Sequence, residues 1–140
     1  MKKETLAQIL TYSGILPFLC AAIIPVIQPD FLTLNYNDII LTYGAVIASF
    51  IAGIHWGVYM FKDTQINLFI HSNIAALLAW FAAVVAIPGS AGILIVCFSY
   101  LLFIDKQLAK VNVIEPWYMR MRIIASTLVI LALACTILFP

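Results

Sequence analysis

Five long apolar stretches make up most of this chain, and short polar connections separate them. A helix rises 1.5 Å per residue, so about 20 apolar residues cross the hydrocarbon core of a bilayer. We predict transmembrane helices over residues 5–27, 38–61, 65–87, 91–108 and 116–139. Hydrophobic residues are 65% of the 140 and charged residues 9%, which excludes a soluble globular domain. The sequence therefore predicts an all-α integral membrane bundle of five helices, forming a single domain over residues 1–140.

Every lysine and arginine falls at one end of this arrangement. The seven are Lys2, Lys3, Lys62, Lys106, Lys110, Arg120 and Arg122. Asp30 and Asp38 fall at the other end. Because basic residues are retained on the cytoplasmic side of a membrane, we predict a cytoplasmic N-terminus and a C-terminus on the opposite side. Four or six spans would break this one-sided distribution.

Small residues recur every four positions in the segment 43–57. They form two rows, Gly44, Ala48 and Ala52, and Ser49, Gly53 and Gly57. Small side chains let helix backbones approach closely where lipid supplies no hydrophobic drive to helix pairing. We predict that this segment is the central helix, with other helices packed on at least two of its sides. Its small faces could also accept a helix from another subunit.

The polar residues of the spans are predicted to gather at the cytoplasmic end. His55 lies about nine residues before the middle of the polar turn at 62–65, and His71 lies about eight residues after it. We therefore expect both histidines roughly 10 Å from the cytoplasmic boundary of the membrane. The other members predicted near this end are Asp105, Arg120 and Arg122, with Trp56, Trp117 and Tyr118. Ionisable groups inside a membrane generally pair with one another or line a water-filled cavity.

The two histidines allow three interpretations. They are candidate haem or metal ligands, because two imidazoles at one depth could serve opposite faces of a ring. They are also explained as ordinary buried histidines that hydrogen-bond Asp105, serine or asparagine, or as substrate contacts. Asp105 itself needs a partner, which Arg120, Arg122 or His55 could supply.

The arginines and aromatic residues allow two interpretations. Arg120 and Arg122 are candidate ligands of an anionic headgroup or a quinone carbonyl, with Trp56 and Trp117 as apolar walls. Alternatively, the arginines reach lipid phosphates, and Trp117 and Tyr118 belong to the interfacial aromatic belt.

No catalytic motif is present. The sequence has no Ser-His-Asp order with a nucleophile elbow and no His-Glu-x-x-His, so no catalytic residue and no bound metal are predicted. Cys20, Cys97 and Cys135 lie in apolar runs and are interpreted as buried hydrophobic side chains. Without a basic run, no nucleic acid partner is expected.

The string Tyr-Gly-Ala-Val-Ile-Ala-Ser-Phe-Ile-Ala-Gly-Ile-His-Trp-Gly at 43–57 resembles the signature of the domain-of-unknown-function 3429 family. Asp105-Lys106 and the segment Pro116-Trp117-Tyr118-Met119-Arg120-Met121-Arg122 are similar to its second motif. The family includes mitochondrial transmembrane protein 69 and many bacterial inner-membrane proteins. The resemblance covers essentially the whole chain. The matching residues are Gly44, Ser49, Phe50, Gly53, Trp56, Gly57, Asp105, Trp117, Tyr118 and Arg122.

The resemblance implies a small multi-pass protein of a bacterial inner membrane, and it assigns no activity. In that membrane the orientation predicted from the basic residues places the C-terminus in the periplasm. Many relatives have arginine where this chain has His55. That departure favours an anion contact or an ion pair with Asp105 over haem ligation, so no cofactor is predicted and haem is kept only as an alternative.

Two functions are therefore carried forward. The first is a non-enzymatic accessory or scaffold protein that binds lipid, or a membrane-protein partner or second copy, through the polar cluster. The alternative is a carrier that holds a quinone, haem or anionic metabolite in a cavity lined by His55, His71, Asp105 and Arg122. A carrier needs a hydrated cavity lined by these side chains. A scaffold pairs them with one another and carries an apolar groove on its lipid face.

Overall fold

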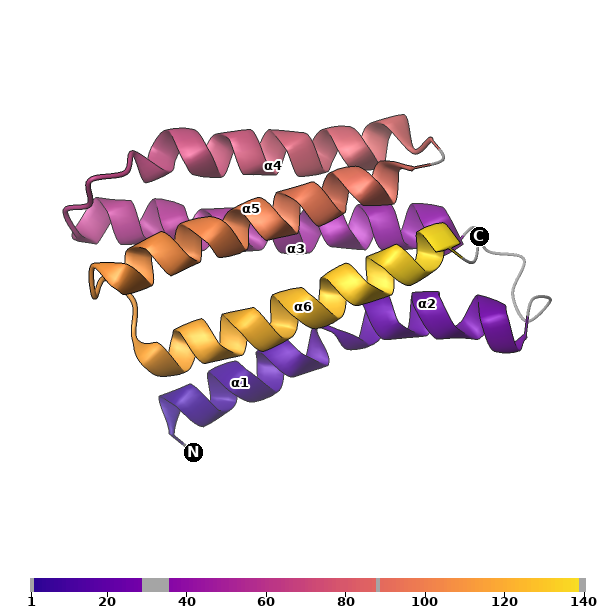
Figure 1. The fold of residues 1–140 in the computed structure, drawn as a ribbon, viewed down its shortest axis with the longest axis horizontal. Helices are drawn as coiled ribbons and strands as arrows, with labels where there is room; N and C mark the ends of the chain where they lie inside the picture. The colour runs from indigo at the N-terminus through magenta and orange to yellow at the C-terminus, as the bar shows by residue number, and fades with distance from the viewer. Residues whose placement is uncertain (1, 29–35, 88, 139–140) are drawn as a thin grey trace.

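A computed structural model describes residues 2–28, 36–87 and 89–138 of the chain (Figure 1). Its helices are α1 (Lys3–Ser13), α2 (Leu16–Ile27), α3 (Tyr36–Phe61), α4 (Leu68–Val85), α5 (Ser90–Lys110) and α6 (Pro116–Leu138). Five segments are long and apolar enough to cross a membrane, with α1 and α2 together forming the first. The described residues contain no strand. The predicted all-α bundle of five spans is confirmed.

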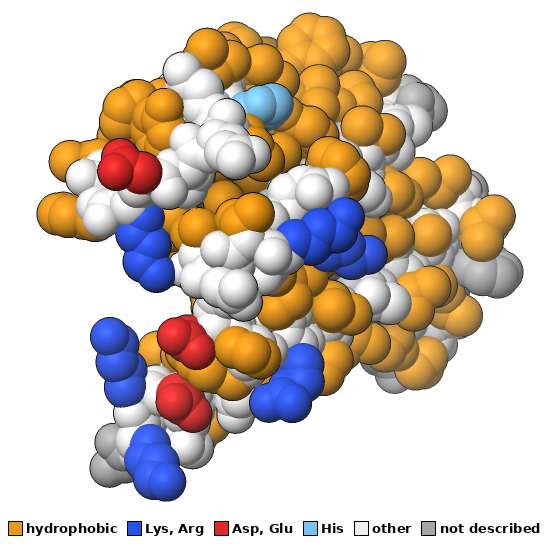
Figure 2. Space-filling model, turned by 60° about the vertical axis from the view of Figure 1, so that its left-hand side comes forward, with side chains coloured by type: hydrophobic (Ala, Val, Ile, Leu, Met, Phe, Trp, Pro, Cys, Tyr) orange, Lys and Arg blue, Asp and Glu red, His pale blue; other side chains and the backbone are white. Residues whose placement is uncertain are grey.

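The helices run roughly side by side along the long axis of the molecule. In Figure 1, α3 and α5 occupy the middle, α4 covers one side, and α6 lies on the other side with α1 and α2 along it. The starts of α1 and α6 and the ends of α3 and α5 meet at one end. Figure 2 looks at this end and shows lysine and arginine side chains gathered there, with hydrophobic side chains on the flanks. We call it the basic end; Asp30, predicted for the other end, lies outside the described residues.

The first span is two helices rather than the single helix predicted over 5–27. Pro17 has no N–H to donate to the carbonyl of Ser13, so the helical hydrogen-bond ladder is interrupted at Gly14 and Ile15. The hydroxyl of Tyr43, on α3, donates to the carbonyl of Gly14 at 2.9 Å. A neighbouring helix thus satisfies a backbone acceptor that the break exposes, as a membrane interior requires.

The connection between α3 and α4 is longer than predicted, because α4 begins at Leu68 rather than at 65. Asn67 is the N-cap, and its side chain accepts a hydrogen bond from the Ile70 N–H at 3.3 Å. Lys62 Nζ donates to the carbonyl of Val113 at 2.7 Å. This bond joins the α3–α4 connection to the α5–α6 connection at the basic end.

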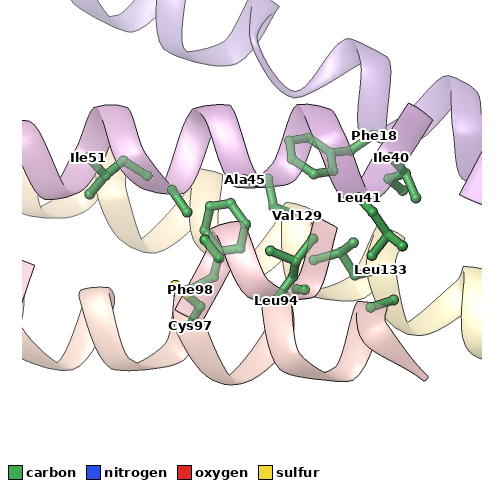
Figure 3. Packing of buried hydrophobic residues seen from close by; sticks show 14 of the residues in the cluster. Phe18, Ile40, Leu41, Ala45, Ile51, Leu94, Cys97, Phe98, Val129 and Leu133 are labelled. Carbon is green, nitrogen blue, oxygen red and sulfur yellow. The ribbon is translucent and has the colours of Figure 1, made fainter. Parts of the chain in front are cut away.

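The hydrophobic core fills the space between α2, α3, α4, α5 and α6, and Figure 3 shows part of it. Phe18 of α2 is fully buried, and its ring lies 5.1 Å from that of Tyr43 and 6.0 Å from that of Phe98, measured between centroids. On α3, Gly44 faces Leu94 of α5. A Cβ added to Gly44 would lie 2.6 Å from Leu94 Cδ1. The side chain of Leu94 therefore occupies the space that a side chain at position 44 would need.

Only one of the two small-residue rows of α3 packs inside the chain. Ala48 and Ala52 are buried with Gly44, whereas Ser49 and Gly53 are exposed. A Cβ at Gly53 or Gly57 would meet no atom within 4 Å. Helices of this chain pack against α3 on more than one side, as predicted, whereas Ser49 and Gly53 of the second row are exposed. The neighbours of α3 are α2, α4 and α5, and α5 has a larger buried share than α3, so these two helices share the centre.

The basic end is predicted to face the cytoplasm, and thiol labelling tests this. Gln65 lies at the basic end and Ile87 at the opposite end, and both side chains are exposed. The two variants Gln65→Cys and Ile87→Cys therefore each place one accessible thiol at one end. In protein that also carries Cys20→Ala and Cys135→Ala, we expect a membrane-impermeant maleimide to label Ile87→Cys in intact spheroplasts. Gln65→Cys should react only after lysis. The reverse pattern would contradict the predicted orientation.

The glycine contact between α3 and α5 makes a prediction about stability. Gly44→Ala should destabilise the protein by about 1–3 kcal/mol, because its methyl group overlaps the buried Leu94 side chain. Gly53→Ala is the matched control on the same helix. Its methyl group enters open space, so stability should stay equal or rise by about 0.5–1 kcal/mol. Unfolding in detergent measures both, and equal losses for the two variants would refute the close packing at Gly44.

Candidate functional site

The site is centred on Asp105, a carboxylate near the end of the apolar helix α5. Its Oδ2 accepts a hydrogen bond from Arg122 Nε at 2.7 Å, and its Oδ1 lies 2.8 Å from His55 Nε2. His55 and Asp105 are each 1% exposed, and Arg122 is 5% exposed. Because a carboxylate only accepts hydrogen bonds, His55 Nε2 carries the proton and donates it. We call these three residues the Asp105 triad.

The triad joins three helices. His55 comes from α3, Asp105 from α5 and Arg122 from α6, so one carboxylate fixes the spacing of all three helices at the basic end. Removing two charges from water is costly, and their mutual attraction offsets that cost only when geometry is good and both oxygens are satisfied. Here each oxygen of Asp105 has a donor. The sequence suggested three partners for Asp105. His55 and Arg122 hydrogen-bond it, whereas Arg120 is exposed.

The structure does not bring His71 to the triad. His71 lies on α4, and its Nδ1 hydrogen-bonds the hydroxyl of Tyr100 on α5. The two rings lie 5.8 Å apart between centroids. His55 and His71 therefore bind different partners. Among the described residues, no group of three or more histidine, cysteine and acidic side chains could hold a metal ion.

Trp56 lies outside the triad, although it follows His55 in sequence. Its ring lies 4.5 Å from that of Phe69 on α4, and the side chain is 42% exposed. Trp117 and Tyr118 pack edge to face at 5.9 Å. Both line a small cavity of about 220 Å³ that also reaches His55 and Asp105. The Nδ1 atom of His55 is buried and has no hydrogen-bond partner among the described residues.

A larger cavity of about 510 Å³ lies between α1, α3 and α6, and we call it the flank cavity. Its apolar walls come from Ala7, Leu10, Ile15, Phe18, Ile47, Phe50, Ile51, Ile54, Phe98, Met121, Ala125 and Val129. Two of these residues, Leu10 and Phe50, are 63% and 68% exposed, so the cavity opens onto the side of the bundle. In a membrane that side faces lipid. Sequence reasoning missed this cavity, because apolar residues from separate helices carry no local signal.

One wall of the flank cavity is formed by three residues with polar side chains. Tyr118, Arg122 and Ser126 line it, and their Oη, Nη2 and Oγ atoms are buried without a hydrogen-bond partner among the described residues. These residues are four positions apart, so they form a stripe along one face of α6. We call it the α6 polar stripe. Sequence reasoning missed Ser126, although the spacing of the stripe was visible.

The arrangement separates two kinds of polar group. The groups of the triad hydrogen-bond one another, while the residues of the α6 polar stripe line a cavity whose other walls are mainly apolar. A hydrated cavity lined by the four proposed carrier residues is not formed by the described part of the chain, because His71 lies elsewhere.

Loss of the triad's negative charge should strongly destabilise the protein. Asp105→Asn leaves Arg122 as a buried cation without its counter-ion, so we expect a loss of about 3–5 kcal/mol in the free energy of unfolding. Asp63→Asn is the matched control, because Asp63 is exposed at the same end. Unfolding in detergent compares the two variants. A loss no larger than that of the control would show that the triad does not hold the bundle together.

Comparison with known proteins identifies the family. The sequence model of one family, "Protein of unknown function (DUF3429)", matches residues 3–138. No curated protein and no solved structure matches the chain. The match runs from the first residue of α1 to the last of α6, so it includes the triad and all five spans. The chain therefore belongs to the DUF3429 family of proteins of unknown function.

Proposed function

We propose that this protein is a non-enzymatic accessory protein that binds a membrane lipid, with the hydrocarbon chain of the lipid held in the flank cavity. The observation that carries the proposal is the cavity itself, about 510 Å³ in volume, walled mainly by apolar side chains and open at Leu10 and Phe50. Its volume lies within the range of about 300–1,000 Å³ typical of ligand sites.

The position of the opening favours a ligand that is dissolved in the bilayer. The exposed side chains around it are hydrophobic, so the opening lies where hydrocarbon surrounds the bundle. A lipid chain would enter sideways without crossing water. A water-soluble metabolite would have to leave its hydration shell for walls that offer it few polar contacts.

The Asp105 triad supports the proposal by holding the cavity open. Asp105 of α5 lies between His55 of α3 and Arg122 of α6, and it links these helices by side chains. The α1 helix then forms the third wall, and none of its side chains is buried. In this proposal the cluster positions the binding site rather than forming it, and no residue has a catalytic role.

The proposal includes a bacterial inner membrane as the location and a cytoplasmic basic end. The support for the location is the resemblance to bacterial inner-membrane proteins. The support for the orientation is the gathering of lysine and arginine side chains at one end (Figure 2).

A second candidate function is the binding of another membrane helix, from a partner protein or a second copy of this chain. It is favoured by the outward row of small residues on α3, where Gly53 and Gly57 leave open space. Such a row lets a second backbone approach closely within lipid.

Filling the flank cavity tests the lipid-binding proposal. Ala125→Phe places a ring inside the cavity, whereas Ile124→Phe, the matched control, places a ring on the exposed face of the same helix. Native mass spectrometry of protein purified in mild detergent measures bound lipid. A photoreactive lipid with a diazirine in its acyl chain measures labelling in membranes. We expect Ala125→Phe to lose most of the bound lipid and of the labelling, and Ile124→Phe to keep both.

Ala7→Phe repeats the test from α1, where no side chain is buried and misfolding is a smaller risk. Equal lipid binding by wild type and both cavity-filling variants would overturn the proposal. Cross-linking for a partner helix at Gly53 would then be the next experiment.

A further inference from the structure

The α4 helix lies along one edge of the bundle and packs against α3 and α5 on its inner side (Figure 1). On its outer side, exposed residues recur at spacings of three and four. They are Ile70, Asn73, Leu77, Trp80 and Val84, and we call them the α4 seam. The four apolar members are 56–63% exposed, and Asn73 is also exposed. This spacing is the pattern by which two helices pack along each other.

We propose that the α4 seam binds the same seam of a second copy of this chain, in a parallel pair whose two Asn73 side chains hydrogen-bond each other. The proposal concerns a different surface from lipid binding, because none of the residues that line the flank cavity belongs to α4. It also differs from the second candidate function, which uses the outward row of small residues on α3.

Asn73 carries the argument, because contact with lipid alone would explain the apolar members of the seam. Its Nδ2 donates to the carbonyl of Phe69, one turn earlier on the same helix, at 2.8 Å. Within the described residues the side chain forms no other hydrogen bond, so one N–H and the Oδ1 acceptor are left to pair. Asn73 lies about 7.5 Å along the axis from Leu68, inside the span 68–85. Hydrocarbon offers it no partner, and asparagine in this setting hydrogen-bonds across helices.

The symmetry of a pair and the chemistry of an amide identify the occupant. Copies of one membrane protein insert with the same orientation, so a closed pair has its two-fold axis along the membrane normal and its two α4 helices run parallel. Matching residues then lie at the same depth, and each Asn73 faces the other. An amide both donates and accepts, so two asparagines complete each other's hydrogen bonds. A single asparagine in such a seam also fixes the register of the two helices.

The charge of α4 permits the contact. The helix contains no aspartate, glutamate, lysine or arginine, so two copies meet without repulsion between like charges inside the membrane. Its histidine, His71, hydrogen-bonds Tyr100 of α5 and is not a member of the seam. Ile70 and Leu77, on either side of Asn73, then pack against their counterparts and exclude lipid from the asparagine pair.

Cysteine cross-linking of the full chain in membranes tests the contact. In protein that also carries Cys20→Ala and Cys135→Ala, Leu77→Cys places a thiol in the seam four residues from Asn73. We expect oxidation with copper phenanthroline to join two copies at this position. Val96→Cys on α5 is the matched control, because Val96 is 61% exposed and Leu77 is 63% exposed. The control should stay monomeric under the same oxidation.

Variants of Asn73 connect the pairing to the amide. Energy transfer between labelled copies in lipid vesicles, at increasing dilution in lipid, measures the affinity of the dimer. Asn73→Leu keeps the seam apolar and removes the amide, so we expect a dimer about fivefold weaker. Asn73→Gln keeps an amide and should retain most of the affinity. Ser99→Ala, which removes an exposed polar group from α5, is the matched control and should pair as the wild type does.

The remaining outcomes contradict the proposal. Wild-type protein that stays monomeric at every dilution overturns it, and so does an Asn73→Leu variant that pairs as tightly as the wild type. Cross-linking of Gly53→Cys in place of Leu77→Cys overturns it in favour of α3. Cross-linking of Leu77→Cys to a different protein overturns the second copy as occupant. Lipid binding is tested independently, because Asn73→Leu should co-purify with as much lipid as the wild type and Ala125→Phe should still pair.

Discussion

A single buried carboxylate organises the basic end of this bundle. The membrane interior offers no water to solvate Asp105, so its charge is stable there only when donors from the protein surround it. Those donors are His55 and Arg122, each from a different helix. The electrostatic requirement of one residue thus becomes a geometric constraint on α3, α5 and α6. Hydrophobic packing alone would not supply it, because the lipid surroundings are as apolar as the helix faces.

The flank cavity lies next to both the triad and the broken first span, because Arg122 and Gly14 line it. Asp105 links α3 and α6 through the side chains of His55 and Arg122. The α1 helix forms another wall of the cavity, and none of the α1 side chains is buried. Pro17 interrupts the hydrogen bonds near Gly14, and the hydroxyl of Tyr43 satisfies the carbonyl that is exposed. Both Gly14 and Phe18 line the cavity, so the break forms part of its wall. Helix geometry, backbone hydrogen bonding and charge pairing meet at the same site.

Polar residues have two distinct roles in the described part of the chain. The triad is closed, because both oxygens of Asp105 have donors, and it explains stability. The residues of the α6 polar stripe line the flank cavity, and its two hydroxyls and Arg122 Nη2 are buried without a partner among the described residues. Arg122 belongs to both groups, since its Nε donates to Asp105 and the residue also lines the flank cavity. Structural support and the proposed binding are therefore coupled through one residue.

By itself, the sequence determined the five apolar spans, the gathering of basic residues at one end, and the need of Asp105 for a partner. These follow from composition and from distance along the chain, because a helix converts residue number directly into depth. Only the tertiary structure decided the rotation of each helix about its axis. That rotation selected Arg122 over Arg120, sent His71 to Tyr100, and turned the row of Ser49 and Gly53 outward. It also created the flank cavity, because apolar residues on separate helices form a cavity only when their faces are placed together.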